Sequence, residues 1–190
     1  ATIANDLMIQ GTASEIVLVD INKQKAFGEA LDIYQGAPFC SPAIVRSGDY
    51  EAAANSDIVI ITSGLPRKPG QTRLDLLGRS IEMLKELTVQ LRPMALTCPV
   101  VSITNPADIV ADYLRKQLSL PRTQCFSTGT LRDTARVIRS IAQDDGTDRR
   151  SVCAFSMGEH GDSSMVPFSA VTVGGVPFDK LGLDKTAILT

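Results

Sequence analysis

The stretch MGEHGDSS, residues 157–164, holds the one histidine of the 190-residue chain, His160, between two glycines. An imidazole titrates near neutral pH, so it can exchange a proton with a substrate when a second group holds the ring in place. A solvated loop histidine is the simpler interpretation of this stretch taken alone. The choice depends on which partners the rest of the chain places near the ring.

Candidate partners for the imidazole occur in LRDTARVIRSIAQ, residues 131–143, whose apolar spacing predicts a helix. Asp133 and Arg136 are three residues apart and therefore share a face of that helix. One interpretation is a surface ion pair, which contributes roughly 0.2–0.5 kcal/mol. In the other interpretation Asp133 orients the imidazole, and Arg136 binds a substrate carboxylate with two parallel hydrogen bonds.

Apolar runs that resemble strands alternate with the helical patterns along the first two thirds of the chain. The runs cover residues 16–20, 57–64 and 99–106, and the helical patterns cover residues 23–36, 73–92, 108–118 and 131–143. This alternation predicts βαβ units and a parallel sheet whose strands are buried on both faces. After Ser151, the short runs 152–156 and 169–173 and the turn at Gly174 and Gly175 predict a more antiparallel segment.

The predicted strands end in polar or small residues: Asp20, Ser63 with Gly64, and Asn105. Ligands of a parallel α/β sheet bind beyond the carboxyl ends of its strands, so these residues are predicted to line a binding crevice. The alternative for each is a turn or a cap, and Asp20 could cap the helix that follows Ile21.

Asp20 also bears on the type of cofactor. A carboxylate at the end of the strand after a phosphate loop accepts both ribose hydroxyls of NAD and repels the 2′-phosphate of NADP. The usual companion motif, G-x-G-x-x-G, is absent from the sequence, and ATIANDLMIQG at its start resembles a helix already under way. We therefore expect NAD as the cofactor, and a first strand and glycine loop that precede residue 1.

Residues 63–76, SGLPRKPGQTRLDL, form a loop with two prolines and two glycines that carries Arg67, Lys68 and Arg73. Such a loop beside a crevice could close as a lid over an anionic substrate. The alternative is a set of solvated loop charges, which is the simpler interpretation of Lys68.

Composition narrows the class of protein. The net charge is −2 without a basic block, so nucleic acid is not expected as a partner, and no apolar run reaches the length that spans a membrane. The start lacks the pattern of a signal peptide. The four cysteines have no CxxC spacing, which favours a reducing cytoplasm and no metal site.

Five segments together are specific: IVLVDI, ITSGLPRKPGQTRLDLL, SITNPAD, STGTLRDTARV and GEHGDSS. In order and spacing, the chain resembles the NAD-dependent L-lactate/malate dehydrogenase family over nearly all its length. The resemblance implies a Rossmann-type doubly wound parallel sheet in a dinucleotide-binding domain, residues 1–127, and the start of an α+β catalytic domain, residues 128–190. It also implies a longer protein, because the family continues beyond LDKTAILT, and a homodimer or homotetramer.

The resemblance assigns roles to individual residues. Asp20 would bind the adenosine ribose, with Ser63, Gly64 and Asn105 also at the cofactor. Arg73 would polarise the substrate carbonyl, and Asn105 would donate a hydrogen bond to the reacting oxygen. Asp133 would pair with His160, which exchanges the proton, and Arg136 would bind the substrate carboxylate. Arg67 matches the position that reads the other end of the substrate.

Several alternatives stay open. Arg67 favours malate and oxaloacetate, whereas Leu74 and Asp75 are more typical of lactate or longer 2-hydroxyacid dehydrogenases. A branch of glycosidases uses NAD on a related fold, but its metal-binding cysteine and histidine pattern is not apparent. A non-catalytic NAD-binding or oligomer-scaffolding relative, and a plain α/β binding module, are the alternatives outside enzymes. Nothing in the sequence explains Arg132.

Overall fold

The computed structural model describes residues 1–64, 73–161 and 163–189, with the side chains of these ranges except those of residues 73–79. The chain forms two compact units. The first comprises residues 1–57 and 85–98, and the second comprises residues 58–84 and 99–190. Helix α3, Arg73–Leu91, contributes to both. The domain boundary expected after residue 127 stays a prediction.

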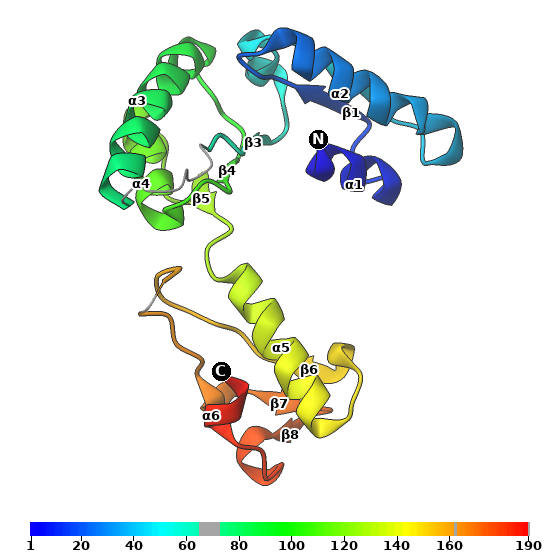
Figure 1. Ribbon diagram of the computed structural model, residues 1–190, viewed down its shortest axis with the longest axis vertical. Helices are drawn as coiled ribbons and strands as arrows, with labels where there is room; N and C mark the ends of the chain where they lie inside the picture. The colour runs from blue at the N-terminus through cyan, green and yellow to red at the C-terminus, as the bar shows by residue number, and fades with distance from the viewer. Residues whose placement is uncertain (65–72, 162, 190) are drawn as a thin grey trace. The chain divides into compact units, whose positions relative to one another are not determined.

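The first unit contains a parallel pair of strands, β1 (Glu15–Leu18) and β2 (Ile44–Ser47), joined by α2 (Lys23–Gln35). Figure 1 shows α2 running beside β1. The helix begins after Asn22, whose side chain accepts a hydrogen bond from the backbone N–H of Lys25 at 3.0 Å. Apolar residues of α1 (Thr2–Gln10), of α2 and of the segment at β2 form the core: Ala4, Met8, Ala30, Ile33, Ala43 and Val45.

The second unit begins with a parallel sheet in the order β3 (Val59–Ile61), β4 (Val100–Ser102) and β5 (Cys125–Ser127). Helix α4 (Ala107–Gln117) connects the last two strands and packs against both, with Leu114 fully buried. The strands are shorter than the predicted runs, because the chain leaves the sheet after Ile61 and after Ser102. Ser63 and Asn105 therefore lie in the loops that follow the strands.

The remainder of the second unit is antiparallel, as the change of pattern after Ser151 predicts. Strands β6 (Val152–Cys153), β7 (Thr172–Val173) and β8 (Val176–Pro177) form one sheet, and α5 (Leu131–Asp145) lies against it (Figure 1). Val137 and Ile141 of α5 are buried in this second core together with residues of the strands and of α6 (Lys185–Ile188). Gly174 and Gly175, with φ of 55° and 82°, form the turn between β7 and β8.

The prediction that the strands are buried on both faces is wrong for the parallel sheet of the second unit. Ile60, Val101 and Phe126 lie in one row across it. Ile60 is 38% exposed and Phe126 is 45% exposed, whereas Val100 on the other face is fully buried. The physical reason is that α4 covers one face of this sheet. Apolar runs of this length cannot distinguish one covered face from two.

Membrane-spanning helices and groups of metal-binding side chains are both absent from the described residues. Within the ranges given above, no helix is both long and apolar enough to cross a bilayer. Among the same residues, no three histidine, cysteine, aspartate or glutamate side chains are grouped so that they could hold a metal ion. All four cysteines are free thiols, and burial raises the pKa of the Cys125 thiol above its usual range.

Candidate active site

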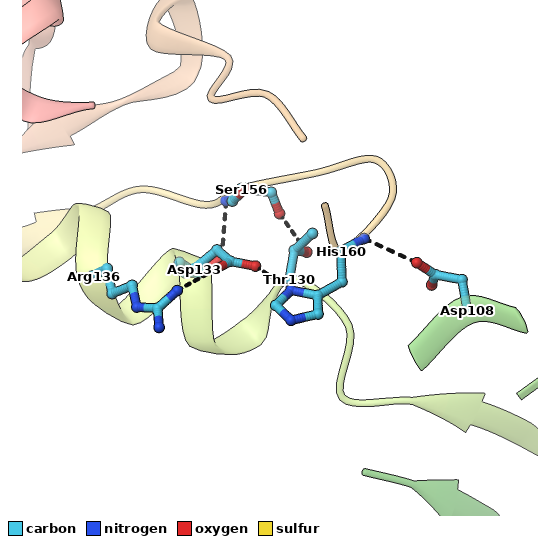
Figure 2. Close-up of polar contacts among 7 residues, drawn as sticks. Asp108, Thr130, Asp133, Arg136, Ser156 and His160 are labelled. Atoms are coloured by element: carbon cyan, nitrogen blue, oxygen red, sulfur yellow. Dashed lines mark hydrogen bonds and ion pairs between the residues drawn. The ribbon is translucent and has the colours of Figure 1, made fainter. Parts of the chain in front are cut away.

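The imidazole of His160 is paired with a carboxylate. Its Nδ1 lies 2.6 Å from Oδ2 of Asp133, which stands in the first turn of α5 (Figure 2). The side chains are 28% and 20% exposed, so the pair is shielded but still within reach of a ligand. When Nδ1 donates its proton to Asp133, Nε2 is left to accept a proton from a bound hydroxyl. This is the geometry of a general base oriented by a carboxylate.

Asp133 holds a second partner with its other oxygen. Oδ1 lies 2.9 Å from Nη1 of Arg136, whose side chain is 61% exposed. The Asp133 carboxylate therefore makes both contacts that the sequence suggested as alternatives: the ion pair with Arg136 and the contact with the His160 imidazole. An exposed pair of this kind contributes about 0–1 kcal/mol. A ligand carboxylate can therefore compete with Asp133 for Arg136.

Two threonines at the start of α5, Thr130 just before its first residue and Thr134, hold the chain that leads into the histidine loop. The hydroxyl of Thr130 donates to the carbonyl oxygen of Ser156 at 2.7 Å. The backbone N–H of Ser156 donates to Oγ1 of Thr134 at 2.8 Å. Ser156 is 7% exposed, so both of its backbone groups need partners from the protein. Sequence reasoning did not single out these threonines, although their spacing around Asp133 on one helix was a usable signal.

The two glycines beside the histidine differ in what the backbone requires of them. Gly158 has φ of 96°, and an added Cβ would lie 3.3 Å from the carbonyl oxygen of Ser163. A Cβ at Gly161 would meet only the side chain of Glu159, at an ordinary distance of 3.7 Å. The turn therefore requires glycine at 158, where side chains are strained, and places no such steric demand at 161.

Asp20 stands in the first unit, two residues after β1. Its Oδ1 accepts a hydrogen bond from the backbone N–H of Asn22 at 2.9 Å, and its side chain is exposed. Asn22 rather than Asp20 caps α2, so the alternative in which Asp20 caps this helix is wrong. Burial raises the pKa of the Tyr50 phenol, and the charges of Asp20 and Glu86 raise it further. An exposed carboxylate in negative surroundings suits a ribose hydroxyl and opposes a phosphate.

The ends of β3 and β4 are tied together. The hydroxyl of Thr104 donates to the carbonyl oxygen of Ser63 at 2.5 Å, and Thr104 is 5% exposed. Gly64 and Asn105, the next residues on the two segments, are exposed. The second unit thus brings two of the three predicted strand ends together, and Asp20 belongs to the first unit.

The segment expected to form a lid, residues 63–76, is only partly covered by the described residues. Arg67 and Lys68 lie outside them. Helix α3 begins at Arg73, whose side chain is also outside the described part of the chain. The expected roles of these three cations therefore stay predictions.

Comparison with known proteins identifies the family. Residues 1–127 match the family model of the lactate/malate dehydrogenase NAD binding domain. The L-lactate dehydrogenase of Acetivibrio thermocellus is 39% identical over 180 residues, which is 95% of this chain and 57% of that protein. The L-lactate dehydrogenase of Thermoanaerobacter sp. is 40% identical over 179 residues, which is 94% of this chain and 58% of that protein.

Solved structures of lactate and malate dehydrogenases also resemble the chain. The minor L-lactate dehydrogenase of Enterococcus mundtii in its ligands-bound form has a TM-score of 0.91 at 36% identity, covering 99% of this chain and 60% of that one. The apo malate dehydrogenase of Picrophilus torridus has a TM-score of 0.90 at 31% identity, covering 98% of this chain and 59% of that one.

The chain spans less than three fifths of the two curated relatives' length, 57% and 58%. The matches confirm three predictions: the family, the Rossmann-type α/β fold and NAD as the cofactor of the predicted domain. A plain α/β binding module is set aside by the family match. With the family model matching residues 1–127 and the fold shared with solved members, the chain belongs to the lactate/malate dehydrogenase family.

Proposed function

We propose that this chain carries the proton-transfer site of an NAD-dependent malate dehydrogenase, which acts on malate and oxaloacetate. The observation that supports this most directly is the contact of 2.6 Å between Nδ1 of His160 and Oδ2 of Asp133. Arg136 on the same carboxylate adds a cation for an anionic substrate. Asp20 supplies an exposed carboxylate for a ribose.

The chemistry assigns a task to each side chain. NAD, when bound, would supply the hydride acceptor for the hydroxyl-bearing carbon, and its reduced form would supply the hydride for the carbonyl carbon. In the oxidation direction Nε2 of His160 takes the hydroxyl proton, and in the reduction direction the imidazolium returns it. Asp133 stabilises the imidazolium and keeps its Nδ1 occupied. Arg136 binds the carboxylate next to the reacting carbon, and Arg73 stabilises the negative charge that develops on the oxygen.

The choice of malate rests on Arg67. Malate and oxaloacetate carry two carboxylates, whereas lactate and pyruvate carry one, and Arg136 accounts for the one that both classes share. Closing an arginine over the methyl group of pyruvate would leave a desolvated charge without a partner. Such a charge costs several kcal/mol, so discrimination of about 10³ against pyruvate is physically reasonable.

The second candidate is an L-lactate dehydrogenase. The relatives from Acetivibrio thermocellus and Thermoanaerobacter sp. carry that name, and Leu74 and Asp75 after the lid arginine are typical of lactate enzymes. The structural neighbour from Picrophilus torridus is a malate dehydrogenase, so names alone do not decide between the two substrates.

The test is a hybrid protein in which residues 1–190 replace the matching part of the Acetivibrio thermocellus enzyme. With NADH, kcat/KM is measured for oxaloacetate and for pyruvate in the hybrid, in its Arg67→Gln variant and in the unchanged relative. We expect the hybrid to favour oxaloacetate and Arg67→Gln to move the ratio toward pyruvate by about 10³. Lys68→Gln is the matched control, and it should leave the ratio within a factor of about two because a solvated lysine suits either substrate.

The outcomes separate the candidates. A hybrid that prefers pyruvate, with a ratio that Arg67→Gln does not move, contradicts the malate assignment and supports the lactate one. A hybrid that binds NADH but turns over neither oxoacid supports a non-catalytic NAD-binding relative.

The sequence of 190 residues by itself should bind NADH weakly and be a poor catalyst. In this fold the pyrophosphate sits on a glycine loop and the helix start that follows it, and the G-x-G-x-x-G motif is not in the sequence. Micromolar affinity in a fluorescence titration of a monodisperse sample would contradict this. We also propose a cytoplasmic homodimer or homotetramer, and analytical ultracentrifugation of the hybrid measures its oligomeric state.

A further inference from the structure

Asp108 contacts the backbone of the histidine itself. Its Oδ2 accepts a hydrogen bond from the backbone N–H of His160 at 2.9 Å, across 52 residues of sequence (Figure 2). Asp108 stands in the first turn of α4, three residues after Asn105. It belongs to the segment SITNPAD.

Among the described residues of the loop, the other hydrogen bonds lie on either side of the His160 backbone, as in the bond from the N–H of Gly161 to the carbonyl oxygen of Glu159 at 2.9 Å. The stem is fixed by the hydrogen bonds that join Ser156 to Thr130 and Thr134, and by the two backbone hydrogen bonds of 2.9 Å between Met157 and Met165. The ring is held by Asp133 through a single atom, Nδ1. A ring held at one atom can still turn about that contact if its backbone moves. The bond from Asp108 fixes the backbone at the residue whose ring must be aimed.

We propose that Asp108 is a positioning residue for His160, acting through the backbone N–H rather than touching substrate or cofactor. It ties His160 to the same short segment that carries Asn105. The imidazole and the Asn105 amide, both expected at the reacting oxygen, are thereby held in a fixed position relative to each other. This role rests on the proposed function of His160. An ionised carboxylate suits it because hydrogen bonds to charged acceptors are roughly twice as strong as neutral ones.

A competing explanation is that Asp108 only stabilises α4. A carboxylate in the first turn of a helix interacts favourably with the helix dipole. Three variants separate the two roles. Asp108→Asn keeps a side-chain oxygen acceptor and loses the charge, and Asp108→Ala loses both. Asp112→Ala removes a carboxylate one turn further along α4, where its partners are Arg115 and Lys116.

The first experiment uses the 190-residue chain and nuclear magnetic resonance. His160 is the sole histidine, so its ring signals are assigned without ambiguity. The ¹⁵N shifts of the two ring nitrogens are measured at a pH high enough to keep the imidazole neutral. They then report the fraction of the Nδ1–H tautomer. Hydrogen exchange of the His160 amide reports the bond to Asp108.

We expect the parent chain to show mainly the Nδ1–H tautomer and a protected amide. Asp108→Ala should speed amide exchange by roughly tenfold or more and move the ring toward the tautomer mixture of free imidazole. Asp112→Ala should keep the parental values, and Asp108→Asn, whose neutral oxygen still accepts, should lie much closer to the parent than Asp108→Ala does. If Asp108→Ala does not fold, Asp108→Ser replaces it, since helix starts tolerate serine and its hydroxyl is too short to reach the amide.

The second experiment measures turnover in the hybrid protein. Asp108→Ala should lower kcat by roughly tenfold or more and leave the affinity for NADH unchanged, because small misplacements of catalytic groups have large effects. Asp108→Asn should restore kcat to within about threefold of the parent, since its amide oxygen keeps an acceptor. Unchanged exchange and tautomer in Asp108→Ala, or an Asp108→Asn variant as impaired as Asp108→Ala, overturns the positioning role. A hybrid without turnover whose resonances respond as expected contradicts the proposed function and leaves the positioning contact supported.

Discussion

The loop that carries His160 and the turn that carries Asp20 are built in different ways. Besides bonds within the loop and its stem, side-chain contacts that join residues 22 to 52 positions apart hold it, from Thr134, Thr130, Asp133 and Asp108. The Asp20 carboxylate is held by a backbone group two residues away. A proton-transfer group must be aimed by the protein before the ligand arrives, whereas a ribose acceptor needs only an exposed oxygen.

The largest effect is expected from a substitution that removes proton transfer in the His160 loop and leaves the Asp20 turn unchanged. His160→Asn in the hybrid protein removes the group that exchanges the proton, so kcat should fall by about 10² to 10⁴. NADH affinity, measured by fluorescence titration, should stay close to the parental value because the ribose acceptor is unchanged. A variant that keeps more than about half of the parental kcat would show that His160 is a loop residue without a catalytic role.

The second effect compares a long-range hydroxyl contact with a local one. Thr134→Val leaves the buried N–H of Ser156 without its acceptor, so the free energy of unfolding should fall by about 1–3 kcal/mol. Thr12→Val is the matched control, because its hydroxyl makes an exposed contact of 3.4 Å with Leu7. Urea unfolding of the 190-residue chain, with hydrogen exchange to locate the change, measures both. If both variants lost the same free energy of unfolding, the long-range contact of Thr134 would be no more important than the local contact of Thr12.

The third effect tests the turn. Asp20→Ser should narrow the preference of the hybrid for NADH over NADPH by roughly tenfold, since it removes the charge that opposes a 2′-phosphate. Asp20→Asn separates charge from local structure, because its side-chain oxygen can still accept from the N–H of Asn22. Both variants should behave alike in binding titrations. An unchanged cofactor ratio would mean that Asp20 serves only the turn.

The smallest effect concerns local ion pairs on α4. Hydrogen bonds from Lys116 and then Arg115 lower the pKa of the exposed Asp112 carboxyl. A lowered folded-state pKa stabilises the protein above the unfolded pKa, and this contribution disappears as the pH falls through the folded value. Asp112→Asn should therefore lower the urea midpoint slightly at pH 7 and leave it unchanged in strong acid. A difference that grows on acidification would refute the assignment.

Sequence patterns predicted the long elements well and the short ones poorly. The helices expected over 23–36 and 131–143 are α2 and α5, within two residues at each end. Strand β5 was missed because a strand of three residues, Cys125–Ser127, carries too little periodicity to be recognised. Strand β2 was missed for a similar reason, since Ile44–Ser47 holds two apolar residues followed by arginine and serine. The expected burial on both faces failed because periodicity reports on apolarity and not on the number of covering layers.

The sequence by itself determined the inventory of this protein: one histidine, an aspartate and an arginine three residues apart, polar strand ends and the order of five family segments. It named Asp133 as the partner of His160 through the resemblance, and the geometry agrees at 2.6 Å. Tertiary structure alone decided that Thr130 and Thr134 bind the backbone of Ser156, and that Asp108 holds the backbone of His160. Local sequence cannot encode such contacts, because they depend on which surfaces of α4 and α5 meet the loop once the apolar faces have packed.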